Sequence, residues 1–299
     1  MSFEDGLKTI VVATDLGGQA EAALEYASKL AHAYGSRIVL AHGLDPMEYA
    51  DVDGVPGTVR RGLTAQAREV LGKLASELMA NGIRSHSEIR QGSIAEMLRD
   101  VARQYQAGLI VIGTRGHEGA GPVVVGAIAE QLVRVAPCPV MAVAADWNAG
   151  ENRPTPGGPV LLALERNAAC AAAAAAAYSL AEKFHRPLIV LHARSSAEVS
   201  AILNPGATTL AEFGIKVRAN VAVRNVVKDG NPPDAIRRAI AQYHPCVLVA
   251  GVKRLSETPG PHGTIFQLLA GSRVPVLCVP PGIVLSVSER EAQIPVEVG

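Results

Sequence analysis

Short apolar runs rich in valine and isoleucine alternate along the chain with longer segments in which apolar residues recur at helical spacing. The runs are nearly continuous in apolar content, which is expected of strands whose sheet is covered by helices on both faces. This alternation predicts a parallel, doubly wound α/β sheet. In the first part of the chain the predicted strands are residues 9–14, 37–42, 84–90, 109–113 and 139–144, and the predicted helices are residues 19–33, 62–80, 94–105 and 127–135.

The same unit occurs twice in the chain, in diverged form. Residues 9–42 align with residues 159–192, which lie 150 positions later. Residues 91–113 align with residues 229–251, which lie only 138 positions later. The second copy has therefore lost a net dozen residues between its second and fourth strands, where connections tolerate changes in length.

The repeat predicts two tandem, Rossmann-like domains, each with a five-stranded parallel sheet flanked by helices. We expect the first domain to span residues 1–147 and the second to span residues 159–282, with a proline-rich linker at residues 148–158. Residues 283–299 form a tail. From residue 280 onward the apolar and polar positions alternate enough to predict an extra strand, or an arm that reaches a neighbour.

The composition limits the possible partners. Twenty-eight basic residues balance 28 acidic ones, which argues against a general nucleic-acid binder because such proteins need clustered Lys and Arg. Glu4 and Asp5 stand where a signal peptide would be basic. The alanine-rich residues 168–181 are shorter than the roughly 20 residues of a membrane span, so they predict a helix in aqueous surroundings. We expect a cytoplasmic protein that contacts neither membrane nor nucleic acid.

Motifs for metal binding and catalysis are scarce. The sequence has no CxxC pair and no histidine pair at metal-ligand spacing, so we expect reduced, buried thiols and no metal site. It also lacks the GxSxG motif of a catalytic serine. His42 and His192 recur at equivalent strand ends, and we interpret both as packing residues. The four widely spaced cysteines are Cys138, Cys170, Cys246 and Cys278.

The segment between the fourth predicted strand and the following helix is rich in glycine. Ligands of doubly wound sheets bind outside the carboxyl ends of the strands, and glycine lets backbone N–H groups approach an anion there. The following helix directs its positive N-terminal end into the same space. The alternative is a merely mobile connection, but the position at the ligand edge favours an anion site. The segment contains Gly113, Gly116, Gly119, Gly121 and Gly126.

Other phosphate-binding loops do not fit the chain, because it has no GxxxxGK(S/T) and no GxGxxG after the first strand. The spacing Gly113-x2-Gly116-x9-Gly126 instead resembles the universal stress protein family, whose nucleotide-binding members carry Gly-x2-Gly-x9-Gly-(Ser/Thr) after the fourth strand. The strand sequences VVATD, VLAH and APCPVMAV support this resemblance, which covers both repeats. It implies a tandem member of the family.

The resemblance also implies a ligand and an assembly. The first domain would bind ATP or another adenine nucleotide, with Mg²⁺ held mainly by the phosphates. The last strands of the two repeats, CPVMAV and VPVLCV, would pair to form a dimer-like unit within one chain. A homodimer of two chains stays open.

By the same resemblance, residues at three strand ends contact the nucleotide. Asp15 would accept a hydrogen bond from the nucleoside, although it is equally suited to cap a helix, a role worth about 1 kcal/mol. Arg115 is equally suited to be a solvated surface charge. Ala13, Thr14 and Asp15 would flank the adenosine, Gly43 would meet the adenine edge, Ile112, Gly113 and Arg115 would line the ribose and phosphates, and Gly116, Gly126, Ala127 and Ile128 would cradle the phosphate tail.

The sequence departs from the family pattern in both copies. Ala127 stands where the family has Ser or Thr, which removes one hydroxyl and costs roughly 0.5–1.5 kcal/mol, or about two- to tenfold in affinity. In the second copy Arg254 takes the second glycine position, Glu165 replaces Asp15, and eight residues instead of nine precede Gly263, although Thr264 restores the hydroxyl. A side chain where glycine would adopt positive φ costs about 1–2 kcal/mol. We expect the second site to be degenerate.

These observations predict a nucleotide-dependent stress-response or signalling module whose glycine loop changes with ATP occupancy and is recognised by an unknown protein partner. Two alternatives remain. One is an interaction scaffold that binds no nucleotide, and the other is a slow ATP hydrolase in which a carboxylate such as Asp15 supports turnover. Since no nucleophile and base are recognisable, we assign no catalytic residue and expect weak ATPase activity at most.

Overall fold

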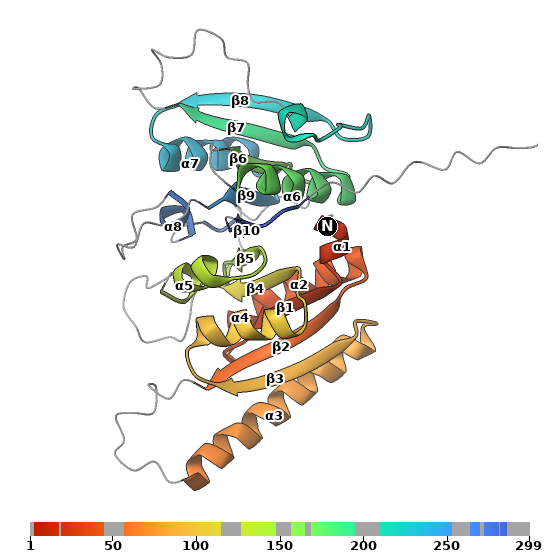
Figure 1. Ribbon diagram of the computed structural model, residues 1–299, viewed down its shortest axis with the longest axis vertical. Coiled ribbons are helices and arrows are strands. Elements are labelled where there is room, and N and C mark those ends of the chain that lie inside the picture. Colours follow the sequence, from red (N-terminus) through yellow and green to blue (C-terminus); the bar gives the residue numbers. More distant parts are fainter. Residues whose placement is uncertain are drawn as a thin grey trace, which may run out of the picture.

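A computed structural model describes residues 3–17, 19–44, 57–114, 127–147, 157–164, 169–194, 210–252, 264–269, 272–280 and 282–285. Within these residues, ten strands form one sheet with helices on both faces (Figure 1). The predicted fold class is confirmed, because the sheet consists of two similar five-stranded parallel halves that follow one another along the chain.

The first half has the strand order β3-β2-β1-β4-β5, and all neighbouring strands in it are parallel. Every predicted strand and helix of this half is present, although α3 begins five residues earlier than predicted. The strands are β1 (Thr9–Ala13), β2 (Arg37–Leu44), β3 (Ser85–Gln91), β4 (Leu109–Gly113) and β5 (Val140–Val143). The helices are α1 (Phe3–Gly6), α2 (Gln19–Tyr34), α3 (Gly57–Ala80), α4 (Ile94–Gln104) and α5 (Ala127–Val135).

The second half has the equivalent order, β8-β7-β6-β9-β10. Between β7 and β8 the described residues contain only a four-residue 3-10 helix, η2, where the first half has the 24-residue α3. This difference corresponds to the shortening predicted from the repeat. The strands are β6 (Val160–Leu164), β7 (Leu188–Arg194), β8 (Val223–Asp229), β9 (Val247–Gly251) and β10 (Val276–Val279), and the helices are α6 (Cys170–Lys183), η2 (Leu210–Phe213), α7 (Pro232–Tyr243) and α8 (Thr264–Leu269).

The two halves meet where β5 pairs with β10, which confirms the predicted pairing of the last strands. This is an antiparallel pairing, with Met141 opposite Leu277. Met141 and Leu277 occupy equivalent positions of CPVMAV and VPVLCV, so each repeat presents the same position to the other. Such self-complementary contact is the hallmark of a two-fold interface, formed here inside one chain.

The hydrophobic core runs through both halves on each face of the sheet. On one face the buried residues come from α2, α3 and α6, and on the other they come from α4, α5, α7 and α8. A row of edge-to-face rings links the halves on the first face, with Tyr34 between Phe3 and Phe184 at ring-centroid distances of 6.4 and 6.3 Å. At the end of the junction, Asp146 forms an ion pair of 3.1 Å with Arg273.

The alanine-rich segment forms the predicted helix, α6, but not in the predicted aqueous surroundings. The residues from Cys170 to Ala181 are nearly all buried. The helix lies against β6 and β9 on one side and contacts α1 and η2 on others. Since alanine projects only a methyl group, these elements can all approach the helix backbone closely.

The connections outside the sheet are only partly described. Residues 148–156 of the predicted linker and residues 286–299 of the tail lie outside the described residues. The tail residues 282–285 form no strand, and the Leu285 side chain packs against the core.

Because Leu277 is fully buried at the centre of the junction, we predict that Leu277→Ala lowers the free energy of unfolding by about 2–5 kcal/mol. Met79→Ala on α3, where the side chain is 56% exposed, should change it by no more than about 0.5 kcal/mol. Urea unfolding followed by circular dichroism measures both. Equal effects of the two substitutions would contradict the central role of the junction.

Candidate functional site

Strands β1 and β4 separate early at their carboxyl ends. They pair only from Ile10 opposite Leu109 to Val12 opposite Val111. On their outer sides the pairing continues further, to Ala13 with β2 and to Gly113 with β5. Because the chain leaves β1 and β4 toward opposite sides of the sheet, this is the topological switch point, where α/β proteins bind ligands. We call residues 13–17 and 112–114 the switch edge.

The fold brings most of the predicted site residues to the switch edge or beside it. Ile112 is buried in the core, so it would contribute through its main chain. Ile128, in the first turn of α5, is 43% exposed. Ala13, Thr14 and Asp15 end or follow β1, Gly43 lies in β2, Ile112 and Gly113 end β4, Ala127 begins α5, and Arg115, Gly116 and Gly126 lie outside the described residues.

A tight turn holds the Asp15 carboxylate at this edge. Its Oδ1 accepts a 2.9 Å hydrogen bond from the Gly17 N–H, and Thr14 Oγ1 accepts a 3.0 Å bond from the Leu16 N–H. Leu16 adopts a φ of 63°, a left-handed conformation that these bonds must stabilise against about 1–2 kcal/mol of steric cost. Since α2 begins only at Gln19, Asp15 closes the turn before the helix and is not its N-cap.

His42 has a polar contact that the sequence did not reveal. Its Nδ1 lies 2.8 Å from the carbonyl oxygen of Thr14. A carbonyl oxygen can only accept, so Nδ1 carries the proton and donates it. The interpretation of His42 as a packing residue was therefore incomplete, and its recurrence as His192 in the second copy was the signal available.

Gly43 leaves room for a close approach of α4. A Cβ at this position would lie 3.1 Å from Met97 Cε and 3.2 Å from Ile94 Cγ1. The first turn of α4 thus packs directly on the end of β2. Ile94 and Met97 were not identified as part of the site from the sequence, because their apolar side chains match the ordinary pattern of a buried helix face.

The second half differs at the corresponding place. There β6 and β9 remain paired through Ala163 opposite Ala250, one step further than β1 and β4. The residues Glu165, Arg254 and Gly263, on which the predicted degeneracy rests, lie outside the described residues.

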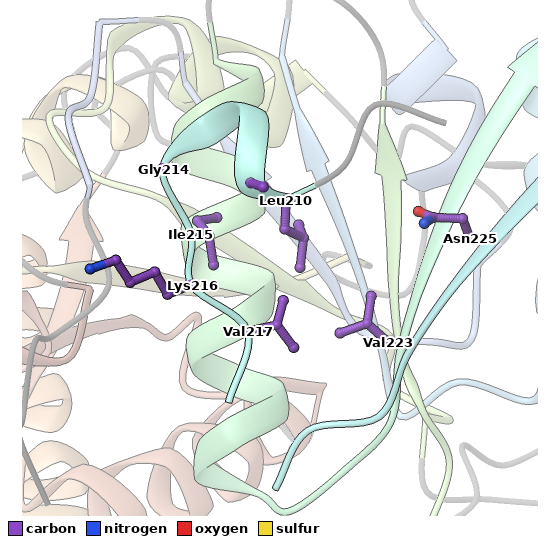
Figure 2. A pocket seen from close by; sticks show the side chains of 8 residues that line it. Leu210, Gly214, Ile215, Lys216, Val217, Val223 and Asn225 are labelled. Atoms are coloured by element: carbon purple, nitrogen blue, oxygen red, sulfur yellow. The ribbon is translucent and has the colours of Figure 1, made fainter. Parts of the chain in front are cut away.

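A cavity of about 470 Å³ lies elsewhere, between η2 and the amino end of β8. Figure 2 shows the side chains of Leu210, Ile215 and Val223 gathered around it, whereas Lys216 extends away. In the first half, α3 covers the corresponding face, where the Ser85 hydroxyl donates to the Ala75 carbonyl at 2.9 Å. The cavity therefore lies beside the shortened connection between β7 and β8 and away from the predicted ligand edge.

Three of the four cysteines are buried, and Cys246 is half-buried. All four cysteines are free of disulfides. Burial raises the pKa of the Cys138 and Cys278 thiols to about 12 and that of Cys246 to about 11, so they stay protonated at neutral pH. In the part of the chain that the structure describes, no three His, Cys, Asp or Glu residues gather as a metal site, and no helix has the length and apolar character to cross a membrane.

Comparison with known proteins gives consistent matches. The profile of the universal stress protein family matches residues 6–144. A universal stress protein of Thermus aquaticus is 33% identical over 139 residues, which make up 46% of this chain and 98% of that protein. One from Mycobacterium tuberculosis is 27% identical over 251 residues, covering 78% of this chain and 82% of that protein.

A solved structure covers nearly the whole chain. The crystal structure of a universal stress protein from Archaeoglobus fulgidus aligns with 92% of this chain and 99% of its own, with a TM-score of 0.72 and 17% sequence identity. At that identity the similarity establishes the fold of both halves.

We predict that Gly43→Val lowers the free energy of unfolding by about 1–3 kcal/mol, because the new side chain must displace Ile94 and Met97. Gly72→Val in α3 is the matched control, since nothing lies within 4 Å of a Cβ there. Thermal unfolding of the two variants makes the comparison. If Gly43→Val were as stable as Gly72→Val, the close packing of α4 on β2 would be wrong.

Proposed function

The chain belongs to the universal stress protein family, and from this premise we propose that its first half binds an adenine nucleotide, foremost ATP, at the switch edge. Occupancy then alters the glycine-rich connection between β4 and α5, and a protein partner recognises the altered surface. The observation that carries the proposal is the early separation of β1 and β4 at the switch point, directly before that connection.

The groups at the switch edge suit the nucleoside. The Asp15 carboxylate is a strong acceptor for hydroxyl or amine donors, and the Gly17 N–H already orients it. Gly43 has no side chain, so the main chain near the end of β2 is open to contact there. Ile94 and Met97 close over the same position from α4 and supply an apolar surface beside it.

The groups beyond β4 suit phosphates. The nine-residue helix α5 begins at Ala127, and the N–H groups of its first turn, which have no acceptor within the helix, favour negative charge. Gly113, Arg115, Gly116 and Gly126 would complete the cradle, as the spacing of the glycines implies. Mg²⁺ commonly keeps several waters and binds chiefly through phosphate oxygens, so it needs no cluster of protein carboxylates.

The second half serves mainly as structural partner in this proposal. Its strands β6 and β9 stay paired one step further, which narrows the separation that a ligand would enter. Arg254 at the second glycine position adds a side chain near the place of the phosphates. We therefore propose one nucleotide per chain.

For the nucleoside contact we predict that Asp15→Asn weakens ATP binding roughly ten- to hundredfold. Asparagine keeps an acceptor for the Gly17 N–H but loses the charge that strengthens the bond to the ligand. Glu165→Gln, at the equivalent position of the second repeat, should bind as the parent does. Isothermal titration calorimetry of the three proteins provides the affinities and the stoichiometry.

Absence of heat and of protection against thermal unfolding at millimolar ATP in the parent protein would reject nucleotide binding and favour the interaction scaffold. Two nucleotides per chain would reject the degenerate second site.

For the phosphate cradle we predict a gain of function. Ala127→Ser restores the hydroxyl that nucleotide-binding members of the family have at this position, and one added hydrogen bond should tighten ATP binding about two- to tenfold. The same titration measures the effect. An unchanged or weaker affinity would show that the start of α5 does not face the phosphates.

A further inference from the structure

We infer that His42 is a positioning residue, whose imidazole holds the turn carrying Asp15 in the orientation that a nucleotide needs. The inference rests on the proposed function and adds a residue to that site. It starts from the contact between His42 Nδ1 and the Thr14 carbonyl oxygen.

Strands β1 and β2 part just before this contact. Their pairing ends with Ala13 opposite Ala41, followed by one bond of 3.0 Å from the Thr14 N–H to the Ala41 carbonyl. Strand β2 nevertheless stays paired with β3 as far as Leu44. The Thr14 carbonyl therefore lies just beyond the last paired residues of β1 and β2, while β2 itself continues. Its hydrogen bond comes from the His42 side chain and not from the main chain of β2.

The bond fixes the turn to the sheet. Beyond Thr14, the Leu16 and Gly17 N–H groups bond to the side chains of Thr14 and Asp15, which lie only two residues away. Such short-range bonds shape the turn but do not set its direction relative to β2. The His42 bond constrains that direction, because it joins the peptide at the base of the turn to the next strand. Thr14 is 8% exposed, so the carbonyl has little access to water as a substitute.

The second repeat provides an internal comparison. His192 is the equivalent of His42, but there the ladder between β6 and β7 continues through Leu164 opposite His192. At this position the second half therefore keeps a main-chain ladder step that the first half lacks. The first half has one ladder step fewer between β1 and β2, and the bond from His42 to the Thr14 carbonyl lies at that position, where the proposed ligand enters.

The test uses His42→Ala, His42→Asn and His192→Ala in the full-length protein. The asparagine amide nitrogen lies as far from the main chain as Nδ1, so His42→Asn can donate to the Thr14 carbonyl, whereas His42→Ala cannot. His42→Gln places the amide one carbon further out and serves in place of alanine if His42→Ala fails to fold.

Two measurements are made on each variant. In calorimetry we expect His42→Ala to weaken ATP binding about tenfold, His42→Asn to stay within about twofold of the parent, and His192→Ala to match the parent. Without nucleotide, we expect the Leu16 and Gly17 amides to exchange with deuterium at least about tenfold faster in His42→Ala than in the parent, with the rate recovered in His42→Asn.

The outcomes separate this inference from the proposed function. If the parent protein binds ATP and His42→Ala binds equally well, the positioning role is overturned. If the parent binds no ATP, the proposed function fails, and amide exchange alone decides whether His42 holds the turn. Unchanged exchange at Leu16 and Gly17 in His42→Ala overturns the inference in either case. Equal losses of affinity in His42→Ala and His192→Ala also overturn it, because they would indicate a general loss of stability.

Discussion

Main-chain hydrogen bonds between β5 and β10 join the two parallel halves of the sheet edge to edge, and both hydrophobic layers depend on this junction, called the seam below. Residues of β5 point alternately into the two layers, as Met141 and Val140 do, and β10 contributes Leu277 and Cys278 in the same alternation. Each layer therefore continues from one half to the other without a polar break. An edge strand as apolar as β5 would otherwise present unpaired N–H and C=O groups to other chains.

The seam also lets the two repeats differ. Because they share one core, the second half keeps its place in the sheet even though η2 replaces α3 and a cavity of about 470 Å³ remains beside it. The first half keeps the features of a ligand edge, with a strained residue at Leu16, an oriented carboxylate at Asp15 and strands that separate early. In our proposal, the first half therefore holds the nucleotide site and the second half supplies structural support.

The sequence was sufficient for the strands and helices, because continuous apolar runs such as residues 109–113 leave little choice of structure. The start of α3 was missed, since residues 57–61 carry no apolar pattern that distinguishes helix from loop. The surroundings of α6 were missed for a related reason: alanine is compatible with both a solvated and a buried helix, and only the neighbours decide.

For the candidate site, sequence reasoning assigned residues to the strand ends at which the structure has them, but it could not supply their contacts. It allowed Asp15 to be a helix cap, whereas the carboxylate bonds to Gly17 before the helix starts, because a left-handed Leu16 intervenes. It gave His42 a packing role, since the bond to Thr14 depends on where two strands part, which is a property of register. The packing of Ile94 and Met97 on Gly43 depends on the approach of a helix that begins 51 residues further along the chain.

The order of the strands along the chain has a consequence for biosynthesis. Strand β5 ends at Val143, and its partner β10 begins only at Val276, about 130 residues later. At about 5–20 residues per second, a ribosome needs roughly 7–26 s to make the intervening chain. Throughout that interval the apolar strand β5 has no β10 to pair with, so its edge is open to pairing with other chains.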